Sequence, residues 1–516
     1  MELEGIFESG EFGHRGGVLP RTWHNEFMTK RNLLIRTHEG GQQITNVFAG
    51  TGAGKTNAVA LAASDDLNLE RVRRVVVCVP TKLILEQTRS VFLNSFGIHL
   101  ARFDARSHKN GVTSEQQGYI TTYAGVASQA AKHRRIARYE PTLAILDEVH
   151  HLGDGESWGD AAQLAFGNVP YLVTCTGSPF RPNSSGRIPF ANYVPTNRAD
   201  ILQYKADYSY SLGRAIVDGY CREPDFRFSD DAVVKIRPAG TDREISVKFS
   251  DNVSEHIAKL RLQAAVQYGS VTRRRLLATA LAECKAAGRK VIIFLGGDTT
   301  IADANSTPTM DVTTHLPAEL AELGYGPDEY VSITMADKRA EHKMNEFRQS
   351  ETAWILGTIG MVSEGANLPE LSAAIFLTTW VADLSFIQRL GRALRFMGKG
   401  DHPDAWFYLF HHPSYHAISL SIKDEMKAEA MMKAKREREA GTNSPGTPQR
   451  TEAVAISGGE ITYSIWNGEK YPAGIYREAM QYIESRGMSK AFLSDVIDQL
   501  RKEQGNVSGN DSRRSG

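Results

Sequence analysis

Short apolar runs, each followed by a longer stretch with amphipathic spacing, recur between residues 40 and 410. The runs have the length of β-strands, are rich in β-branched or aromatic residues, and are continuous rather than alternating. Continuous apolar runs are typical of strands that are buried on both faces, as in a parallel sheet covered by helices. The expected strands are 44–48, 75–79, 143–146, 171–175, 291–295, 353–356 and 374–378.

These runs form two groups, which predicts two sheets. The first group ends near Cys175 and the second begins near Val291. Between them, residues 232–237 and 244–249 alternate apolar and polar positions, which predicts a pair of antiparallel strands. We therefore expect an α/β protein with two tandem domains, each a parallel sheet under helices, and a small C-terminal module.

The domain boundaries follow from changes in composition. A charged helical run at 423–440 precedes a cluster of Pro, Gly, Ser and Thr at 443–449, which is typical of a linker. The predicted parts are listed by residue number: a first domain with its connecting segment at 1–235, a second domain at 236–415, a charged helix and linker at 416–456, a small module at 457–504, and a disordered tail at 505–516.

Composition and charge limit the class of protein. Hydrophobic residues make up 41% of the 516 residues, which argues against a disordered chain. Lys and Arg total 60, as do Asp and Glu, so local basic patches must hold any polyanion. Candidate patches lie at 132–138, 273–275 and 433–438, and each could equally be a solvated helix face.

The cellular setting is inferred from cysteines and apolar segments. The four cysteines are far apart, with no metal-ligand spacing, and are typical of free thiols in a reducing compartment. The acidic start of the chain lacks the pattern of a signal peptide. No apolar run approaches the roughly 20 residues that span a bilayer. We expect a cytoplasmic protein that does not bind a membrane.

The strongest local motif is AGTGAGKT at residues 49–56, between an expected strand and a helical run. Glycines let backbone N–H groups converge on a phosphate chain at the N-terminus of a helix. Lys55 would reach the β- and γ-phosphates, and Thr56 would bind Mg²⁺ through its hydroxyl. A dinucleotide-binding turn would need glycine where Lys55 stands. The motif predicts ATP and Mg²⁺ as ligands, held by Thr51, Gly52, Ala53, Gly54, Lys55 and Thr56.

An acidic pair, Asp147 and Glu148, directly follows the apolar run at 143–146. In a phosphate-loop enzyme, Asp147 would hold Mg²⁺ while Glu148 orients and deprotonates the attacking water. The neighbouring His150 and His151, with Asp154, could instead bind a metal. A pair of histidines that starts a helix and bonds to its neighbours is the favoured interpretation.

The order of motifs resembles helicase superfamily 2, of the DExH type. The matching segments are 49–56 (motif I), 80–82 with Gln87 (Ia), 121–123, 147–150 (II), 176–179 (III), 290–297 (IV), 358–369 (V) and the run QRLGRALR at 388–395 (VI). The resemblance covers residues 15–415. The segments TGSPFR and YSLGRAIVDGY are most similar to bacterial and phage helicases akin to the motor subunit of type III restriction enzymes.

The resemblance implies two RecA-like domains with ATP in the cleft between them. Arg392 and Arg395, three residues apart and expected on one helix face, would stabilise the γ-phosphate in the transition state. His150 and Gln388 would link motifs II and VI. By the same resemblance, the residues that contact nucleic acid are Pro80, Thr81, Lys82, Thr122, Tyr123 and Thr358, and those that couple the ATP and nucleic-acid sites are Thr176, Ser178 and Gly365.

Three positions depart from the family pattern. Trp23 and His24 occupy a segment that resembles an adenine-reading motif, in which glutamine is usual where His24 stands. An imidazole nitrogen can donate or accept one hydrogen bond where an amide group does both, which puts the expected preference for ATP over other triphosphates in doubt. Asn367 replaces a common aspartate, and Gly177 replaces a frequent alanine, a change expected to have little effect.

Three classes of function remain at this stage. The first is an ATP-dependent helicase or translocase that acts on DNA more than on RNA, with an RNA helicase as its variant. The second is a non-unwinding motor subunit of a larger defence, repair or restriction complex, with a protein partner at the C-terminal module. The third, a nucleotide-gated scaffold without catalysis, is disfavoured by the intact Lys55, Glu148, Arg392 and Arg395.

Overall fold

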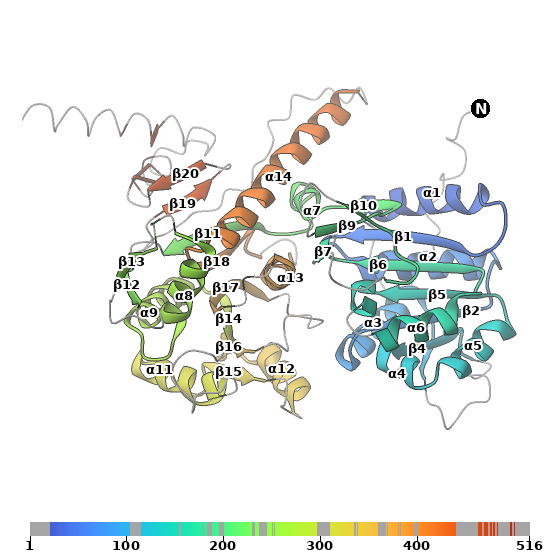
Figure 1. The fold of residues 1–516 in the computed structure, drawn as a ribbon, viewed down its shortest axis with the longest axis horizontal. Coiled ribbons are helices and arrows are strands. Elements are labelled where there is room, and N and C mark those ends of the chain that lie inside the picture. The colour runs from blue at the N-terminus through green and yellow to red at the C-terminus, as the bar shows by residue number, and fades with distance from the viewer. Residues whose placement is uncertain are drawn as a thin grey trace, which may run out of the picture. The chain divides into compact units, whose positions relative to one another are not determined.

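The computed structural model divides into two compact units, the first running to Ser211 and the second beginning at Leu212. Each unit contains one large sheet with helices (Figure 1). The structure describes residues 21–103, 115–153, 156–178, 180–182, 188–195, 201–229, 233–236, 245–249, 251, 253–296, 310–334, 337, 339–359, 368, 370–379, 381, 383–396, 401–439, 463–466, 469–472, 475–476, 478–479, 482, 496–497 and 500.

The first unit is built on a seven-stranded sheet in the order β10-β1-β6-β5-β2-β4-β3. Every neighbouring pair in this sheet is parallel. The strands are β1 (Gln43–Ala49), β2 (Arg74–Val79), β3 (Leu100–Arg102), β4 (Gly118–Thr122), β5 (Thr142–Asp147), β6 (Tyr171–Thr176) and β10 (Tyr208–Tyr210). A separate antiparallel sheet contains β7 (Phe180–Pro182), β8 (Tyr193–Pro195) and β9 (Ile201–Tyr204).

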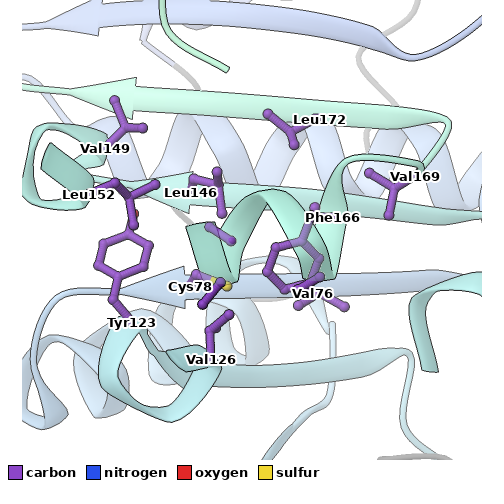
Figure 2. Packing of buried hydrophobic residues seen from close by; sticks show 14 of the residues in the cluster. Val76, Cys78, Tyr123, Val126, Leu146, Val149, Leu152, Phe166, Val169 and Leu172 are labelled. Atoms are coloured by element: carbon purple, nitrogen blue, oxygen red, sulfur yellow. The ribbon is translucent and has the colours of Figure 1, made fainter. Parts of the chain in front are cut away.

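Helices connect these parallel strands, as parallel pairing requires. They are α2 (Lys55–Asn68), α3 (Lys82–Phe96), α4 (Tyr123–Ser128), α5 (Ala130–Tyr139), the 3₁₀-helix η1 (Val149–Gly153) and α6 (Glu156–Phe166), while α1 (Thr22–Arg36) precedes β1. All six residues of β2 are buried, which explains the unbroken apolar run from Val75 to Val79. Figure 2 shows the core on one face of the sheet, where Phe166 of α6 lies close to Val76 of β2.

The second unit is built on an eight-stranded sheet in the order β15-β16-β14-β17-β18-β11-β19-β20. The first six strands pair in parallel, and β19 and β20 are antiparallel. The strands are β11 (Glu223–Ser229), β14 (Lys290–Gly296), β15 (Tyr330–Ile333), β16 (Ile355–Thr358), β17 (Leu371–Thr378), β18 (Asp404–Phe410), β19 (Tyr463–Trp466) and β20 (Glu469–Pro472), with a hairpin of β12 (Val233–Ile236) and β13 (Ile245–Lys248).

The helices of the second unit lie between and after these strands. They are α7 (Leu212–Val217), α8 (Glu255–Val266), α9 (Val271–Ala286), the π-helix η2 (Asp311–His315), α11 (Leu316–Glu322), α12 (Ala340–Gln349), α13 (Asp383–Ala393) and α14 (Pro413–Glu439). The long α14 contacts α7 along its side, where the backbone N–H of Gly213 donates to Glu425 at 3.1 Å. Part of the charged run expected near 423–440 is therefore a packed helix.

The sheets confirm the α/β class, the seven expected strands and the antiparallel pair near 232–249. Two placements differ from the expected boundaries. β11 lies before residue 235 but belongs to the second sheet, because it pairs with β18. β19, in the expected C-terminal module, pairs with the other edge of β11 and so extends the same sheet.

Two expectations about the setting can be compared with the structure. The four cysteines, all of them described, are buried and form no disulfide. Among the helices within the described ranges, none combines the length and the apolar character needed to cross a membrane.

Candidate nucleotide-binding site

The candidate residues of the first unit follow the carboxyl ends of parallel strands. The phosphate loop follows β1, the acidic pair ends β5, and Gly177 and Ser178 follow β6. In the sheet, β6 lies between β1 and β5. Because these strands are parallel, their carboxyl ends lie at one edge, which is where ligands bind in open α/β sheets.

The phosphate loop has a backbone that only glycine adopts easily. Gly52 and Gly54 have φ angles of 84° and 93°, in the left-handed region. Gly54 directly precedes α2 and caps its N-terminus. Exposed N–H groups and the helix dipole at such a terminus favour an anion. The loop therefore fits a phosphate chain, as the motif predicted.

Helix α1 supports this loop from the side. The indole Nε1 of Trp23 donates to the carbonyl oxygen of Ala53 at 3.0 Å, and Nη1 of Arg21 donates to that of Gly52 at 3.2 Å. Trp23 is fully buried and stacks on Tyr210, with ring centroids 4.8 Å apart. The side chain of Trp23 therefore holds the loop in place and has no surface left for a nucleotide base.

His24 is buried beside the same loop. Its Nδ1 accepts a hydrogen bond from the backbone N–H of Arg21 at 3.2 Å. Burial, and then the charge of Arg21, lower the pKa of His24 to about 3. The ring is therefore neutral near pH 7, and because Nδ1 accepts, the proton is assigned to Nε2. Nε2 is buried beside Gly54 of the loop and carries the only donor of the ring.

Lys55 and Glu148 form an ion pair at the centre of the site. Nζ of Lys55 lies 3.1 Å from Oε1 of Glu148. The second carboxylate oxygen, Oε2, accepts a hydrogen bond from the backbone N–H of Gly177 at 2.9 Å. Glu148 has a φ of 50°, in the left-handed region that is strained for a residue with a side chain. Such strain is concentrated at functional sites, where surrounding contacts maintain it.

Burial and charge set the protonation of this group. Burial alone lowers the pKa of Lys55, but the nearby carboxylates, above all Glu148, outweigh it and raise that pKa. Burial also opposes ionisation of Glu148, but Lys55 outweighs it, so that the pKa of Glu148 is lowered. Glu148 is therefore ionised at neutral pH, the state a general base needs.

Asp147 ends β5 and is mostly buried. Burial, followed by repulsion from Glu148, raises the pKa of Asp147. A cation would stabilise its ionised form, and the oxygens of Asp147 and Thr56 are ligands of the kind that Mg²⁺ prefers. Within the described ranges, no group of three or more His, Cys, Asp and Glu could hold a metal ion by itself. A site that uses few protein ligands, together with substrate phosphates, is usual for Mg²⁺.

Motifs II and III are joined by a hydrogen bond. Nδ1 of His150 lies 2.9 Å from the hydroxyl oxygen of Thr176. That oxygen also accepts from the backbone N–H of Ser178 at 3.1 Å. The hydroxyl of Ser178 is buried and has no partner. Thr176 and Ser178, expected to couple two sites, are thus buried next to the acidic pair.

In the second unit, motif VI lies on α13 and just after it. Gln388 is half-buried, Arg392 is largely buried, and both lie within the helix. The sequence predicted Arg392 and Arg395 on one helix face, but α13 ends at Ala393 and Arg395 forms a β-bridge with Cys221. The helix ends there because the backbone carbonyl of Leu394 accepts from the N–H of Arg222 at 2.8 Å.

Arg222, which the sequence analysis did not identify, holds this end of α13 in place. Its Nη1 donates to the carbonyl oxygens of Leu371 and Ala393, at 2.5 and 2.7 Å. Its Nη2 lies 2.7 and 2.6 Å from the two carboxylate oxygens of Asp401. The side chain is fully buried. No motif contains Arg222, and only its position after YSLGRAIVDGY could have drawn notice.

Comparisons with known proteins agree with the order of these sites. Residues 24–181 match the family described as "Type III restriction enzyme, res subunit". Residues 273–397 match "Helicase conserved C-terminal domain". The first match spans motifs I to III and the second spans motifs IV to VI. The chain resembles the superfamily 2 helicases. Its two units are the tandem RecA-like domains of that superfamily, and the first is similar to the type III restriction subunit.

Three similar proteins illustrate this resemblance. An uncharacterised protein of Mycobacterium tuberculosis is 29% identical over 359 residues, which cover 68% of this chain and 56% of the relative. An uncharacterised protein of Mycobacterium leprae is 28% identical over 456 residues, covering 83% and 71%. The chain thus spans little more than half the length of the M. tuberculosis relative. The solved structure of the "ATP-dependent Type ISP restriction-modification enzyme LlaBIII bound to DNA" is 12% identical, with a TM-score of 0.47 over 79% of this chain and 30% of that one.

The helicase-like first unit exposes some of the residues expected to contact nucleic acid. Thr81 and Thr122 cap the N-termini of α3 and α4, accepting from the N–H groups of Ile84 and Gly125 at 3.3 and 3.1 Å. Pro80 and Thr81 are half-buried and Lys82 is exposed. These three residues are accessible at the start of α3.

Other expected contacts are buried. Tyr123 is 1% exposed, and its hydroxyl donates to the carbonyl oxygen of Asp147 at 2.5 Å. Its side chain supports the acidic pair and is not accessible to nucleic acid in this structure. Thr358 is likewise 1% exposed, with a hydroxyl that has no hydrogen-bond partner. Gly365 and Asn367 lie outside the described residues.

One of the candidate basic patches is largely internal. Arg273 is 1% exposed and pairs with both Asp311 and Glu319 at 2.8 Å. Arg274 pairs with Glu322 at the surface. At least these two arginines of 273–275 are thus engaged by carboxylates, which favours the structural reading of this patch. In the patch at 132–138, Arg135 and Arg138 are exposed.

Proposed function

We propose that this protein is an ATP-dependent helicase or translocase that acts on nucleic acid, on DNA more than on RNA. The observation that carries the proposal is the placement of Lys55 and Glu148. A phosphate-loop lysine and an ionised carboxylate lie 3.1 Å apart at the N-terminus of α2. Together they provide a cation for the triphosphate and a base for the attacking water.

The residues of the first unit divide the work of hydrolysis. The N–H groups of residues 52–54 and the first turn of α2 bind phosphate oxygens. Lys55 leaves Glu148 and neutralises the β- and γ-oxygens, and Glu148 then accepts the proton of the attacking water. Thr56 and Asp147 would hold Mg²⁺. When bound, Mg²⁺ would neutralise the charge that develops between the leaving oxygens.

The second unit contributes the arginines of motif VI. Arg392 and Arg395 remain protonated under all physiological conditions, so they can supply positive charge to the γ-phosphate as it transfers. Arginines in this role contribute about 10³–10⁵ in rate. We propose that these arginines act on the γ-phosphate only when nucleic acid is bound, so that hydrolysis depends on the bound strand.

The contacts with nucleic acid in this proposal come from Thr81, Lys82 and Thr122. The exposed ammonium of Lys82, at the start of α3, would bind a backbone phosphate. Phosphate contacts give affinity that falls with salt and carries no base sequence information. The preference for DNA rests on the similarity of residues 24–181 to a restriction-enzyme subunit.

A panel of nucleic acids tests this proposal. ATP turnover of the full chain is measured with single-stranded DNA, duplex DNA, a forked duplex and matched RNA, and strand displacement is followed on a tailed duplex. We expect DNA to stimulate turnover more than RNA, with displacement of the strand. Stimulation without displacement favours a non-unwinding motor subunit instead. Equal or greater stimulation by RNA contradicts the preference for DNA.

A further inference from the structure

The absence of a side chain at Gly177 is what allows the Lys55–Glu148 ion pair. A Cβ atom added at Gly177 would lie 2.5 Å from Nζ of Lys55 and 3.5 Å from Oε1 of Glu148. The first distance is well below van der Waals contact. The atom it meets is the end of a flexible lysine, so the lysine would move and the backbone would not.

The same residue holds the other side of the carboxylate. The backbone N–H of Gly177 donates to Oε2 of Glu148 at 2.9 Å, so Glu148 is bound by Gly177 on one oxygen and by Lys55 on the other. His150 also lies 3.5 Å from Oε2. The side chains of Lys55 and Glu148 are 12% and 22% exposed, so water screens their attraction only in part.

We propose that Gly177 is a positioning residue: by leaving room for Nζ of Lys55 beside Glu148, it sets how readily a triphosphate can take the phosphate-loop lysine from the general base. This inference rests on the proposed function, because it concerns the step in which a triphosphate takes Lys55 from its ion pair with Glu148. In the ion pair, Lys55 and Glu148 engage each other, so a triphosphate competes with Glu148 for the lysine ammonium. Binding therefore begins by breaking the ion pair, and some affinity is lost to that step.

Replacing Gly177 by alanine separates the two effects of the glycine. Alanine keeps the backbone N–H that binds Glu148 but adds the Cβ that displaces Lys55. We therefore expect Gly177→Ala to bind triphosphate more tightly, on the order of tenfold, because a displaced Lys55 no longer has to leave Glu148. A purely structural role predicts the opposite, since a packing defect beside the loop would weaken binding.

Gly326 offers a matched control in the other unit. Its N–H also donates to a carboxylate, Oε2 of Glu329, at 3.0 Å, and a Cβ there would lie 2.7 Å from Oδ1 of Asp328. Gly326→Ala therefore introduces the same kind of close approach, far along the chain from the phosphate loop. We expect it to leave nucleotide binding unchanged.

The test has two readouts. In the nucleotide-free protein, labelling of Lys55 by an amine-reactive reagent is quantified by mass spectrometry, and we expect faster labelling in both Gly177→Ala and Glu148→Gln. The dissociation constant for adenylyl imidodiphosphate with Mg²⁺ is then measured by calorimetry. We expect Gly177→Ala to tighten binding in the native background and to have less than about a twofold effect in Glu148→Gln, where the charge pair is already absent.

Two outcomes overturn the inference. The first is unchanged labelling of Lys55 in Gly177→Ala, which would show that the lysine was not displaced. The second is unchanged or weaker triphosphate binding, or an equal gain in the Glu148→Gln background. If the native protein fails to bind the analogue although Lys55 labelling responds as expected, the positioning role of Gly177 holds and the proposed function is what fails.

Discussion

Nδ1 of His150 lies 2.9 Å from the hydroxyl oxygen of Thr176. This contact connects the end of β5, which carries the acidic pair, to the end of β6, its neighbour in the sheet. His150 also approaches Glu148, at 3.5 Å. Thr176 in turn accepts from the N–H of Ser178. A shift in the position of Ser178 would therefore be transmitted to Glu148 through the side chains of Thr176 and His150.

Thr176→Val is expected to uncouple nucleic acid from hydrolysis. Valine keeps the shape of threonine but removes the hydroxyl, which takes one hydrogen-bond partner from Nδ1 of His150 and the acceptor from the N–H of Ser178. A buried group that loses its hydrogen bond costs about 1–3 kcal/mol, and about 1.4 kcal/mol corresponds to tenfold in rate. We expect stimulation of ATP turnover by DNA to fall by about that factor while triphosphate affinity is retained. Thr176→Ser, which keeps the hydroxyl, serves as the control and should retain stimulation.

Arg222→Met is expected to destabilise the second unit strongly. The change leaves Asp401 and the carbonyl oxygens of Leu371 and Ala393 without their shared partner. Removing one member of a buried ion pair costs about 3–5 kcal/mol. Arg274→Met breaks the exposed pair with Glu322 and should cost less than about 1 kcal/mol. Urea unfolding of both variants measures the difference, and equal free energies of unfolding would contradict the supporting role of Arg222.

The stability of the first unit should fall with acid through His133. Burial lowers the pKa of His133 to about 4, below its ordinary value of 6.5, and its Nδ1 lies 2.8 Å from the hydroxyl of Tyr119. As the pH falls, His133 is protonated in the unfolded chain before it is protonated in the folded one. The contribution of neutral His133 to the free energy of unfolding is therefore fully present above pH 6.5 and is lost between pH 6.5 and 4. The loss is up to about 3 kcal/mol.

Glutamine at position 133 isolates this contribution. His133→Gln retains a hydrogen-bonding group but does not titrate, so the unfolding free energy should depend less steeply on pH between 6.5 and 4. His24 and His412 also have lowered pKa values through burial and titrate in the same direction, so part of the slope should persist. A slope identical to that of the native protein would show that His133 is not buried in its neutral form.

Those parts of the fold and site that depend on contiguous residues could be predicted from the sequence. The phosphate loop is encoded by glycines at 50, 52 and 54 beside Lys55, and the strands by unbroken apolar runs such as that at 75–79. Pairing between distant segments could not be read in this way. β11 joins the second sheet because it lies between β18 and β19, and both partners are far along the chain.

The same limit applies to individual side chains. Tyr123 belongs to the segment 121–123 and was expected to contact nucleic acid, but its hydroxyl donates to the carbonyl oxygen of Asp147, which is 24 residues away. Gly177, which replaces a frequent alanine, was expected to have little effect, and its local sequence gives no sign that Lys55 and Glu148 lie beside it. Arg395 was expected on the helix of motif VI, but α13 ends at Ala393. Arg222 donates to the backbone carbonyl oxygens of Ala393 and Leu394 at that end. In each case the decisive contact is tertiary and leaves no local pattern.

The most direct test of the central claim is ATP turnover by Glu148→Gln with single-stranded DNA, measured beside triphosphate affinity. Glutamine preserves the shape of the side chain but cannot accept the proton from water, and a general base contributes about 10²–10⁴ in rate. We predict that turnover falls by at least about 100-fold while the protein still binds Mg²⁺ and the ATP analogue. Turnover at the native rate, with the triphosphate still bound, would contradict the assignment of Glu148 as the base.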